Sequence, residues 1–166
     1  NQPRVLAPEQ RLQLVNALLA AGVAHIEVGS FVSPKAVPAM AGTAEVVVGL
    51  PANAASYSAL VPNGQGLDRA LAAGVDKIAV FTAVSETFNQ KNINTSIAGS
   101  LERFEAVIQE ARSAGIPVRG YLSTAFWCAF EGRIPPDSVV SVAERLVDLV
   151  AARGDAVAGG PHRAGT

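Results

Sequence analysis

The chain has 166 residues, of which 49% are hydrophobic and 16% are charged, and its formal net charge is −1. This length suffices for the core of one domain, and the near-neutral charge gives no electrostatic case for nucleic acid or an anionic membrane as a partner. No segment approaches the roughly 18 uninterrupted apolar residues of a membrane span. Cys128 is the single cysteine, which excludes an internal disulfide. We therefore expect a globular protein with the cytoplasm as its default location.

A unit made of a helical run, a glycine and a short apolar run recurs along the chain. Gly22, Gly74, Gly115 and Gly154 mark its four copies. Glycine readily takes the left-handed conformation that closes a helix, and apolar runs this short and continuous are typical of buried parallel strands. Strands are therefore predicted at residues 24–28, 77–81, 117–122 and 155–158.

Turn and capping signals predict the other elements. A fifth strand is expected at residues 57–61, ended by the breaker cluster at 62–64. The first helix runs roughly over 8–21, because Pro8 suits a first turn and apolar residues follow at helical spacing. Ser96 or Ser100 can cap the helix that carries the apolar positions of 101–108, and the prolines at 135–136 open the helix over 139–150.

The alternation of helices and strands predicts a parallel α/β sheet with right-handed crossovers. Open doubly wound sheets usually carry a glycine-rich phosphate loop after the first strand, which this sequence lacks. A (β/α)8 TIM barrel is favoured, but a complete one takes about 250 residues. The prediction is an incomplete barrel of about five β/α units over residues 1–158, followed by an irregular tail at 159–166.

Active sites of parallel α/β folds lie at the carboxyl ends of the strands. Glu27 is the sharpest candidate there, because an acid between Ile26 and Val28 is expected to be desolvated and to need a cation, a metal or hydrogen-bond donors. The competing interpretation is a structural ion pair with Arg119. His25, on the same strand face as Glu27, and Cys128 are both interpreted as structural.

Two further groups of polar residues are candidates. Arg119 and Tyr121 flank Gly120, so strand alternation places both side chains on one face, either as site residues or as a packing layer of the barrel. The arginine could bind a substrate carboxylate or orient Glu27, and the tyrosine could donate to a developing enolate oxygen. Asn92 and Ser96 belong to a polar cluster beside a helix N-terminus, which suits an anionic group or ordinary capping.

The segment at 26–40, which reads Ile-Glu-Val-Gly-Ser-Phe-Val-Ser-Pro-Lys-Ala-Val-Pro-Ala-Met, resembles the signature stretch of hydroxymethylglutaryl-CoA lyases. The resemblance covers about residues 1–158. It continues in family order at residues 60–63, 85–88, 91–94, 100–104, 118–121 and 130–132.

This resemblance implies a metal-dependent cleavage of 3-hydroxy-3-methylglutaryl-CoA into acetyl-CoA and acetoacetate, a step of leucine degradation and ketone-body formation. It implies Mg²⁺ or Mn²⁺ as the cofactor, removal of the tertiary hydroxyl proton by a base, and retro-aldol cleavage. The resemblance also assigns roles to matching residues. Glu27 corresponds to the active-site glutamate, Ser30 lies in the signature loop, Asn92 and Ser96 lie near the acyl-CoA, and Arg119 and Tyr121 support the pocket.

The chain departs from the family pattern at both ends. The Gly-Pro-Arg-Asp-Gly motif, with its essential arginine and metal-binding aspartate, would come before Asn1. The Leu-Gly-Asp-Thr motif expected after the last helix is replaced by residues 159–166, which we interpret as a reading-frame disturbance in the gene or an error in the cloned sequence. The His-x-His ligands, a further asparagine ligand and the catalytic cysteine belong to the C-terminal part of the family. We therefore assign no metal ligand in this chain and expect an inactive or partial lyase.

Two other functions are compatible with the same barrel. One is an acyl-CoA condensing synthase of the isopropylmalate or citramalate type, against which the stretch at 30–40 argues. The other is a non-catalytic remnant that binds acyl-CoA. An incomplete barrel leaves strand edges unpaired, so it predicts a homo-oligomer.

Overall fold

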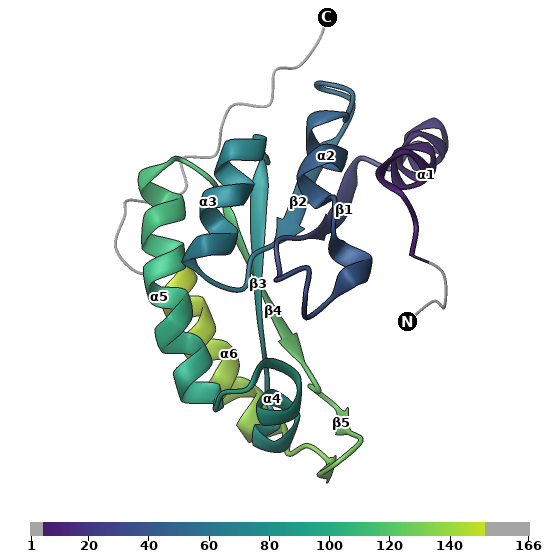
Figure 1. Cartoon of the computed structure of the whole chain (residues 1–166). Helices are drawn as coiled ribbons and strands as arrows, with labels where there is room; N and C mark the ends of the chain where they lie inside the picture. The colour runs from purple at the N-terminus through teal and green to yellow at the C-terminus, as the bar shows by residue number, and fades with distance from the viewer. Residues whose placement is uncertain (1–4, 152–166) are drawn as a thin grey trace, which may run out of the picture.

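The computed structural model describes residues 5–151, which form one parallel sheet with helices packed along it (Figure 1). The sheet has four strands in the order of the chain. They are β1 (His25–Ser30), β2 (Ser56–Leu60), β3 (Lys77–Ala83) and β4 (Val118–Ser123). Each strand pairs in parallel with the next, as in a (β/α)8 barrel, and the described residues therefore form an open part of such a barrel.

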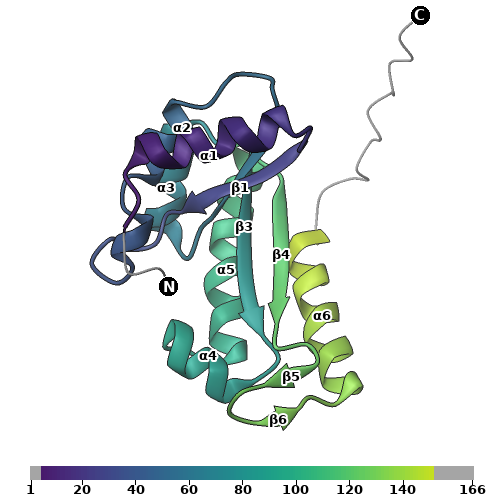
Figure 2. The ribbon, with the colours of Figure 1, turned by 90° about the vertical axis from the view of Figure 1, so that its right-hand side faces the viewer.

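The helices are α1 (Pro8–Ala20), α2 (Thr43–Val48), α3 (Gly64–Ala73), α4 (Glu86–Ile93), α5 (Ile97–Ser113) and α6 (Pro136–Ala151), with a 3-10 turn η1 (Pro38–Met40) before α2. They alternate with the strands, beginning with α1 before β1, and two helices, α4 and α5, lie between β3 and β4. Figure 2 shows α5 and α6 along β3 and β4, and α1 beside β1. A small antiparallel hairpin, β5 (Trp127–Cys128) with β6 (Gly132–Arg133), follows β4. None of the helices within residues 5–151 is long and apolar enough to cross a lipid bilayer.

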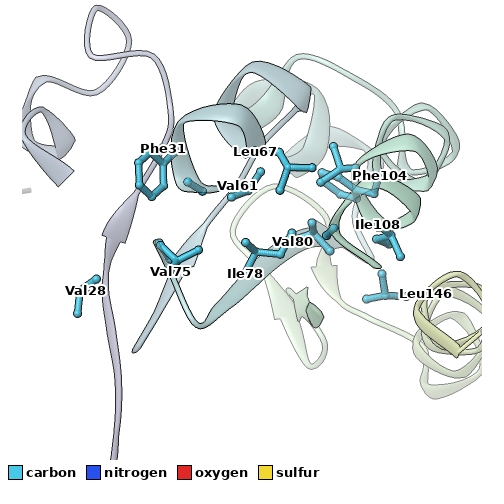
Figure 3. Close-up of a cluster of buried hydrophobic side chains, with 14 of the residues drawn as sticks. Val28, Phe31, Val61, Leu67, Val75, Ile78, Val80, Phe104, Ile108 and Leu146 are labelled. Carbon is cyan, nitrogen blue, oxygen red and sulfur yellow. The ribbon is translucent and has the colours of Figure 1, made fainter. Parts of the chain in front are cut away.

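The hydrophobic core lies between the sheet and the helices (Figure 3). Ile78 and Val80 of β3 and Leu67 of α3 are completely buried there, and Phe104 and Ile108 of α5 are 3% and 2% exposed. Burial of a leucine or isoleucine side chain contributes about 1.5–3 kcal/mol to folding. This packing fixes β3 and α5, and with them the segment containing α4 that joins them at the carboxyl edge of the sheet.

The glycine pattern predicted three helix ends correctly. Gly22, Gly74 and Gly115 all have positive φ, at 83°, 81° and 72°, directly after or close to the ends of α1, α3 and α5. The strands predicted at 57–61, 77–81 and 117–122 correspond to β2, β3 and β4 within a few residues. The predicted strand at 155–158 and the tail at 159–166 lie outside the described residues.

One helix was not predicted from the sequence. Most of the segment at 85–94 is α4, which Ser85 caps by accepting a hydrogen bond from the Phe88 N–H at 3.0 Å. The breaker cluster at 62–64 follows the end of β2, as predicted, and it also starts the next helix, because Asn63 is the N-cap of α3 and accepts from the Gly66 N–H at 2.9 Å.

Candidate active site

Side chains from the two edge strands meet on the face of the sheet opposite the helices. Tyr121 of β4 donates its hydroxyl to Oε2 of Glu27 on β1 at 3.0 Å, although 94 residues separate them. Nη1 of Arg119 lies 3.5 Å from the same hydroxyl. Three strand spacings separate β1 from β4, or roughly 14 Å in a flat sheet. A single hydrogen bond across that interval requires a sheet curved toward this face, as in a barrel.

Glu27 is exposed, so the expectation that it is desolvated is wrong for the described residues. Exposure alternates along β1: His25 and Glu27 are exposed, whereas Ile26 and Val28 are 7% exposed and pack into the core. The reason is that Glu27 points to the concave face, which no element within residues 5–151 covers.

The nearest partner of Glu27 is Tyr121 rather than Arg119. Hydrogen bonding and charge interaction with Tyr121 raise the pKa of the Arg119 guanidinium above its ordinary value, and Glu27 adds a smaller contribution. Arg119 thus donates to the tyrosine hydroxyl, which in turn donates to Glu27. The predicted placement of Arg119 and Tyr121 on one face is confirmed by their contact.

A pocket of about 450 Å³ brings together three of the predicted site residues. Glu27, Ser30 and Asn92 line it from β1 and from the C-terminal end of α4. Ser30 is 7% exposed, and its Oγ donates to the Leu60 carbonyl at 3.3 Å and accepts from the Val32 N–H at 3.3 Å. Ser30 thus fixes the backbone at the pocket edge, while Asn92 is exposed and presents its amide there.

Ser96 caps a helix, which is one of the two roles that the sequence left open for it. It is the N-cap of α5, and its Oγ accepts from the Gly99 N–H at 3.0 Å. Glu86 occupies the same helix end, because its Oε2 accepts from the Ile97 N–H at 2.9 Å. Ser96 is also outside the lining of the 450 Å³ pocket. The N-terminus of α5 is therefore satisfied by the chain's own side chains.

A buried polar network supports this region and was missed by sequence reasoning. Asn89, which is completely buried, accepts from the Ala83 N–H at 3.0 Å and donates Nδ2 to Thr82 Oγ1 at 3.0 Å. Thr82 Oγ1 lies 2.7 Å from Ser100 Oγ, which donates to the Ile97 carbonyl at 2.7 Å. The network joins β3, α4 and α5, and so positions Asn92. The sequence gives no signal of this burial, because Asn89 is a polar residue within the largely polar segment of α4.

Two arginines, also missed from sequence, anchor the loop between β1 and α2. Arg11 of α1 donates to the carbonyls of Val28 at 3.0 Å and Ala41 at 2.9 Å, and to Thr43 Oγ1 at 3.0 Å. Burial lowers the pKa of the Arg11 guanidinium, and Glu45 partly offsets this.

Arg69 of α3 donates to the carbonyls of Phe31 and Val32 in the same loop. Gly29 belongs to this arrangement, since a Cβ at that position would collide with the Arg11 guanidinium and would lie 2.8 Å from Thr43 Oγ1. The loop is therefore held at both ends by cations from neighbouring helices.

Cys128 is structural in its surroundings. It is 1% exposed, its Sγ donates to Ser85 Oγ at 3.1 Å, and it accepts from the Phe130 N–H at 3.3 Å. The thiol thereby joins the β5–β6 hairpin to the start of α4.

Within residues 5–151, no three histidine, cysteine, aspartate or glutamate side chains lie close enough to hold a metal ion. Glu27 is the one carboxylate that lines the 450 Å³ pocket. A single exposed carboxylate with neutral neighbours is too few ligands for Mg²⁺, which prefers octahedral oxygen coordination. The described residues do not by themselves fit a divalent cation.

Comparisons with known proteins identify the family of the chain. A family model described as HMGL-like matches residues 1–158. Hydroxymethylglutaryl-CoA lyase of Pseudomonas mevalonii is 47% identical over 150 residues, covering 90% of this chain and 50% of that protein. A Pseudomonas aeruginosa protein named 3-hydroxy-3-isohexenylglutaryl-CoA/hydroxy-methylglutaryl-CoA lyase is 46% identical over the same coverage.

The structure of an Acinetobacter baumannii HMG-CoA lyase in complex with coenzyme A and 3-methylmalate superposes with a TM-score of 0.84 at 31% identity. The aligned region covers 89% of this chain and 48% of the Acinetobacter chain. The chain spans about half the length of the curated relatives it matches. Because the family model extends over nearly the whole chain, the chain belongs to the HMGL-like family of carbon–carbon lyases.

Proposed function

We propose that the chain forms the part of a lyase that binds and positions 3-hydroxy-3-methylglutaryl-CoA for cleavage into acetyl-CoA and acetoacetate. The observation that carries this is the pocket at the carboxyl ends of β1–β3, which Glu27, Ser30 and Asn92 line. It lies where active sites form in such barrels. The alternative of a condensing synthase is not favoured, because the named relatives are lyases.

Glu27 is proposed as a catalytic residue and Tyr121 as the residue that orients it. The Tyr121 hydroxyl donates its hydrogen bond to Oε2 of the Glu27 carboxylate. Oε1, which receives no hydrogen bond from residues 5–151, is left to accept one from the tertiary hydroxyl of the substrate. Arg119 supplies positive charge beside the tyrosine. This charge suits an anionic substrate group.

The remaining parts of the function are proposals of the same kind. Ser30 and Asn92 are proposed to contact the acyl-CoA, and the coenzyme A bound in the Acinetobacter relative supports a CoA thioester as ligand. Ser96 is proposed to act indirectly, through the start of α5. Mg²⁺ or Mn²⁺ is proposed to be held mainly by residues of the family outside 5–151, and to polarise the substrate when bound.

The context is also proposed. We assign residues 1–158 to the barrel domain and 159–166 to a segment outside it. We place the protein in the cytoplasm, in leucine degradation and ketone-body formation. A homo-oligomer is expected because the outer edges of β1 and β4 have no strand partner within the described residues.

The direct test is an assay of acetoacetate release from 3-hydroxy-3-methylglutaryl-CoA with Mg²⁺. It compares this chain with a chimera in which residues 5–151 replace the matching half of the Pseudomonas mevalonii lyase. We expect activity in the chimera, loss of activity on addition of EDTA, and at least a hundred-fold loss in Glu27→Gln. A folded chimera that binds the substrate but releases no acetoacetate would favour a non-catalytic acyl-CoA-binding role.

A further inference from the structure

A small polar hollow lies on the concave face of the sheet where the strands begin. Its volume is about 30 Å³. It is lined by His25, Ile26 and Glu27 of β1, Ser56 and Ser58 of β2, Lys77 of β3 and Arg119 of β4. His25, Ser56 and Lys77 are the first residues of their strands. The hollow is thus at the opposite ends of the strands from the 450 Å³ pocket, which has the place of an active site. We call it the amino-end hollow.

Ser58 is a buried polar side chain without a partner. It is 7% exposed, and its hydroxyl makes no hydrogen bond to any group of residues 5–151. Among the described residues, every completely buried side-chain nitrogen or oxygen has a hydrogen-bond partner. Ser58 Oγ therefore keeps access to solvent, and the hollow that Ser58 lines supplies it. A nearly buried hydroxyl in such a place favours a bound ligand that accepts its hydrogen.

Lys77 is the second side chain without a partner. It is half-buried, and within the described part of the chain it makes neither an ion pair nor a hydrogen bond through its ammonium group. The sheet register pairs Ser58 with Glu27 on one side and with Lys77 on the other. Paired residues of parallel strands point to the same face. The ammonium group of Lys77 and the hydroxyl of Ser58 are therefore neighbouring donors at one hollow.

The charges around the amino-end hollow favour an anion. Lysine and arginine are positively charged at neutral pH, so Lys77 and Arg119 supply two positive charges against the single carboxylate of Glu27. Oε2 of that carboxylate already accepts from Tyr121. Arg119 donates through Nη1 to the same tyrosine, and its other N–H groups have no acceptor within residues 5–151. The remaining donors outnumber the acceptors, which argues against a bound cation.

The volume of the hollow decides which anion fits. A water molecule needs about 10–15 Å³ of such volume, so 30 Å³ admits one ion of a size close to that of water but no phosphate.

We propose that the amino-end hollow binds one halide ion, with chloride as the physiological example. The ion accepts hydrogen bonds from Ser58 and Lys77, and Arg119 adds positive charge. It does not take part in the proposed reaction, since residues at the amino ends of barrel strands serve stability rather than catalysis. Its effect is to neutralise charge and to tie together the starts of β2 and β3.

The test is titration of this chain with chloride at constant ionic strength, followed by the line width of the ³⁵Cl nuclear magnetic resonance. We expect saturable broadening with a dissociation constant on the order of 10 mM, as suits a few charge-assisted hydrogen bonds offset by desolvation. Bromide should displace chloride, and inorganic phosphate at equal ionic strength should not.

Three variants test the assignment of residues. Lys77→Gln removes the nearest charge and should weaken chloride binding about ten-fold, whereas Ser58→Ala removes a neutral donor and should weaken it about three-fold. Lys35→Gln is the matched control and should bind like the native protein, because Lys35 is exposed and lies outside the lining. Circular dichroism checks that each variant is folded, and if Lys77→Gln is not, Ser58→Ala decides alone.

Several results would overturn the proposal. Broadening that never saturates, or that phosphate removes as well as bromide does, would mean that anions only screen an open surface. Equal effects of Lys77→Gln and Lys35→Gln would place the ion elsewhere. Displacement of chloride by 3-hydroxy-3-methylglutaryl-CoA would assign the hollow to the substrate carboxylate instead. None of these results bears on acetoacetate release, so the proposed function is tested separately.

Discussion

The buried network at Asn89 gives the most quantitative prediction. In Asn89→Ala the Ala83 N–H loses its acceptor and Thr82 Oγ1 loses a donor, both in a fully buried place. A buried donor left unsatisfied costs about 1–3 kcal/mol, and a lost hydrogen bond costs about 1 kcal/mol more. We expect Asn89→Ala to lower the free energy of unfolding by about 2–4 kcal/mol.

Urea denaturation followed by circular dichroism measures this loss. With a urea dependence of about 2 kcal/mol per M, the midpoint should fall by about 1–2 M. Gln90→Ala is the matched control, because Gln90 is the next residue of α4, is exposed, and bonds only to the side chain of Asn94 within the described residues. Its effect should stay within about 0.5 kcal/mol. If Asn89→Ala unfolds the chain, Ser100→Ala should show a smaller loss of about 1 kcal/mol. Equal midpoints for the Asn89 and Gln90 variants would refute the reasoning.

Three further predictions concern packing and pH. Leu67→Ala removes a completely buried side chain and should cost about 2–5 kcal/mol in urea denaturation. Gly120→Ala places a Cβ 2.9 Å from the Leu146 side chain and should lower the free energy of unfolding by about 1–3 kcal/mol through overpacking. The measurement is the melting temperature, which should fall. An unchanged melting temperature would mean that α6 shifts freely. Hydrogen bonds from Thr87 lower the pKa of Glu131. Its contribution to stability should therefore be present at neutral pH and be lost as pH falls through that lowered pKa, so melting temperatures of native protein and Glu131→Gln should converge in acid and differ at pH 7.

The strands were predictable because each carries a short apolar run, and the face of Arg119 and Tyr121 was predictable from the period of two. The contact of Tyr121 with Glu27 was not, since it depends on curvature accumulated over four strands. The exposure of Glu27 was mispredicted because its apolar neighbours face the helices and give no information on the other face.

The helices α2 and α4 could not be predicted from local pattern. Residues Thr43–Val48 contain three consecutive valines, which by propensity favour a strand, yet they pack as a helix against α1, α3 and β1. The sequence of α4 is largely polar, and distant partners support it. The Thr87 N–H donates to Glu131 at 2.7 Å, across 44 residues. Tertiary contacts thus decide both elements, as weak local propensity allows.

The way in which Arg11 and Arg69 hold the β1–α2 loop has an evolutionary consequence. Most of their acceptors are main-chain carbonyls, at Val28, Phe31, Val32 and Ala41. Every residue type offers the same carbonyl, so the path of the loop does not depend on the side chains at 32, 37 and 40. Substitutions at these positions can change the side chains that the loop presents while its backbone path stays the same.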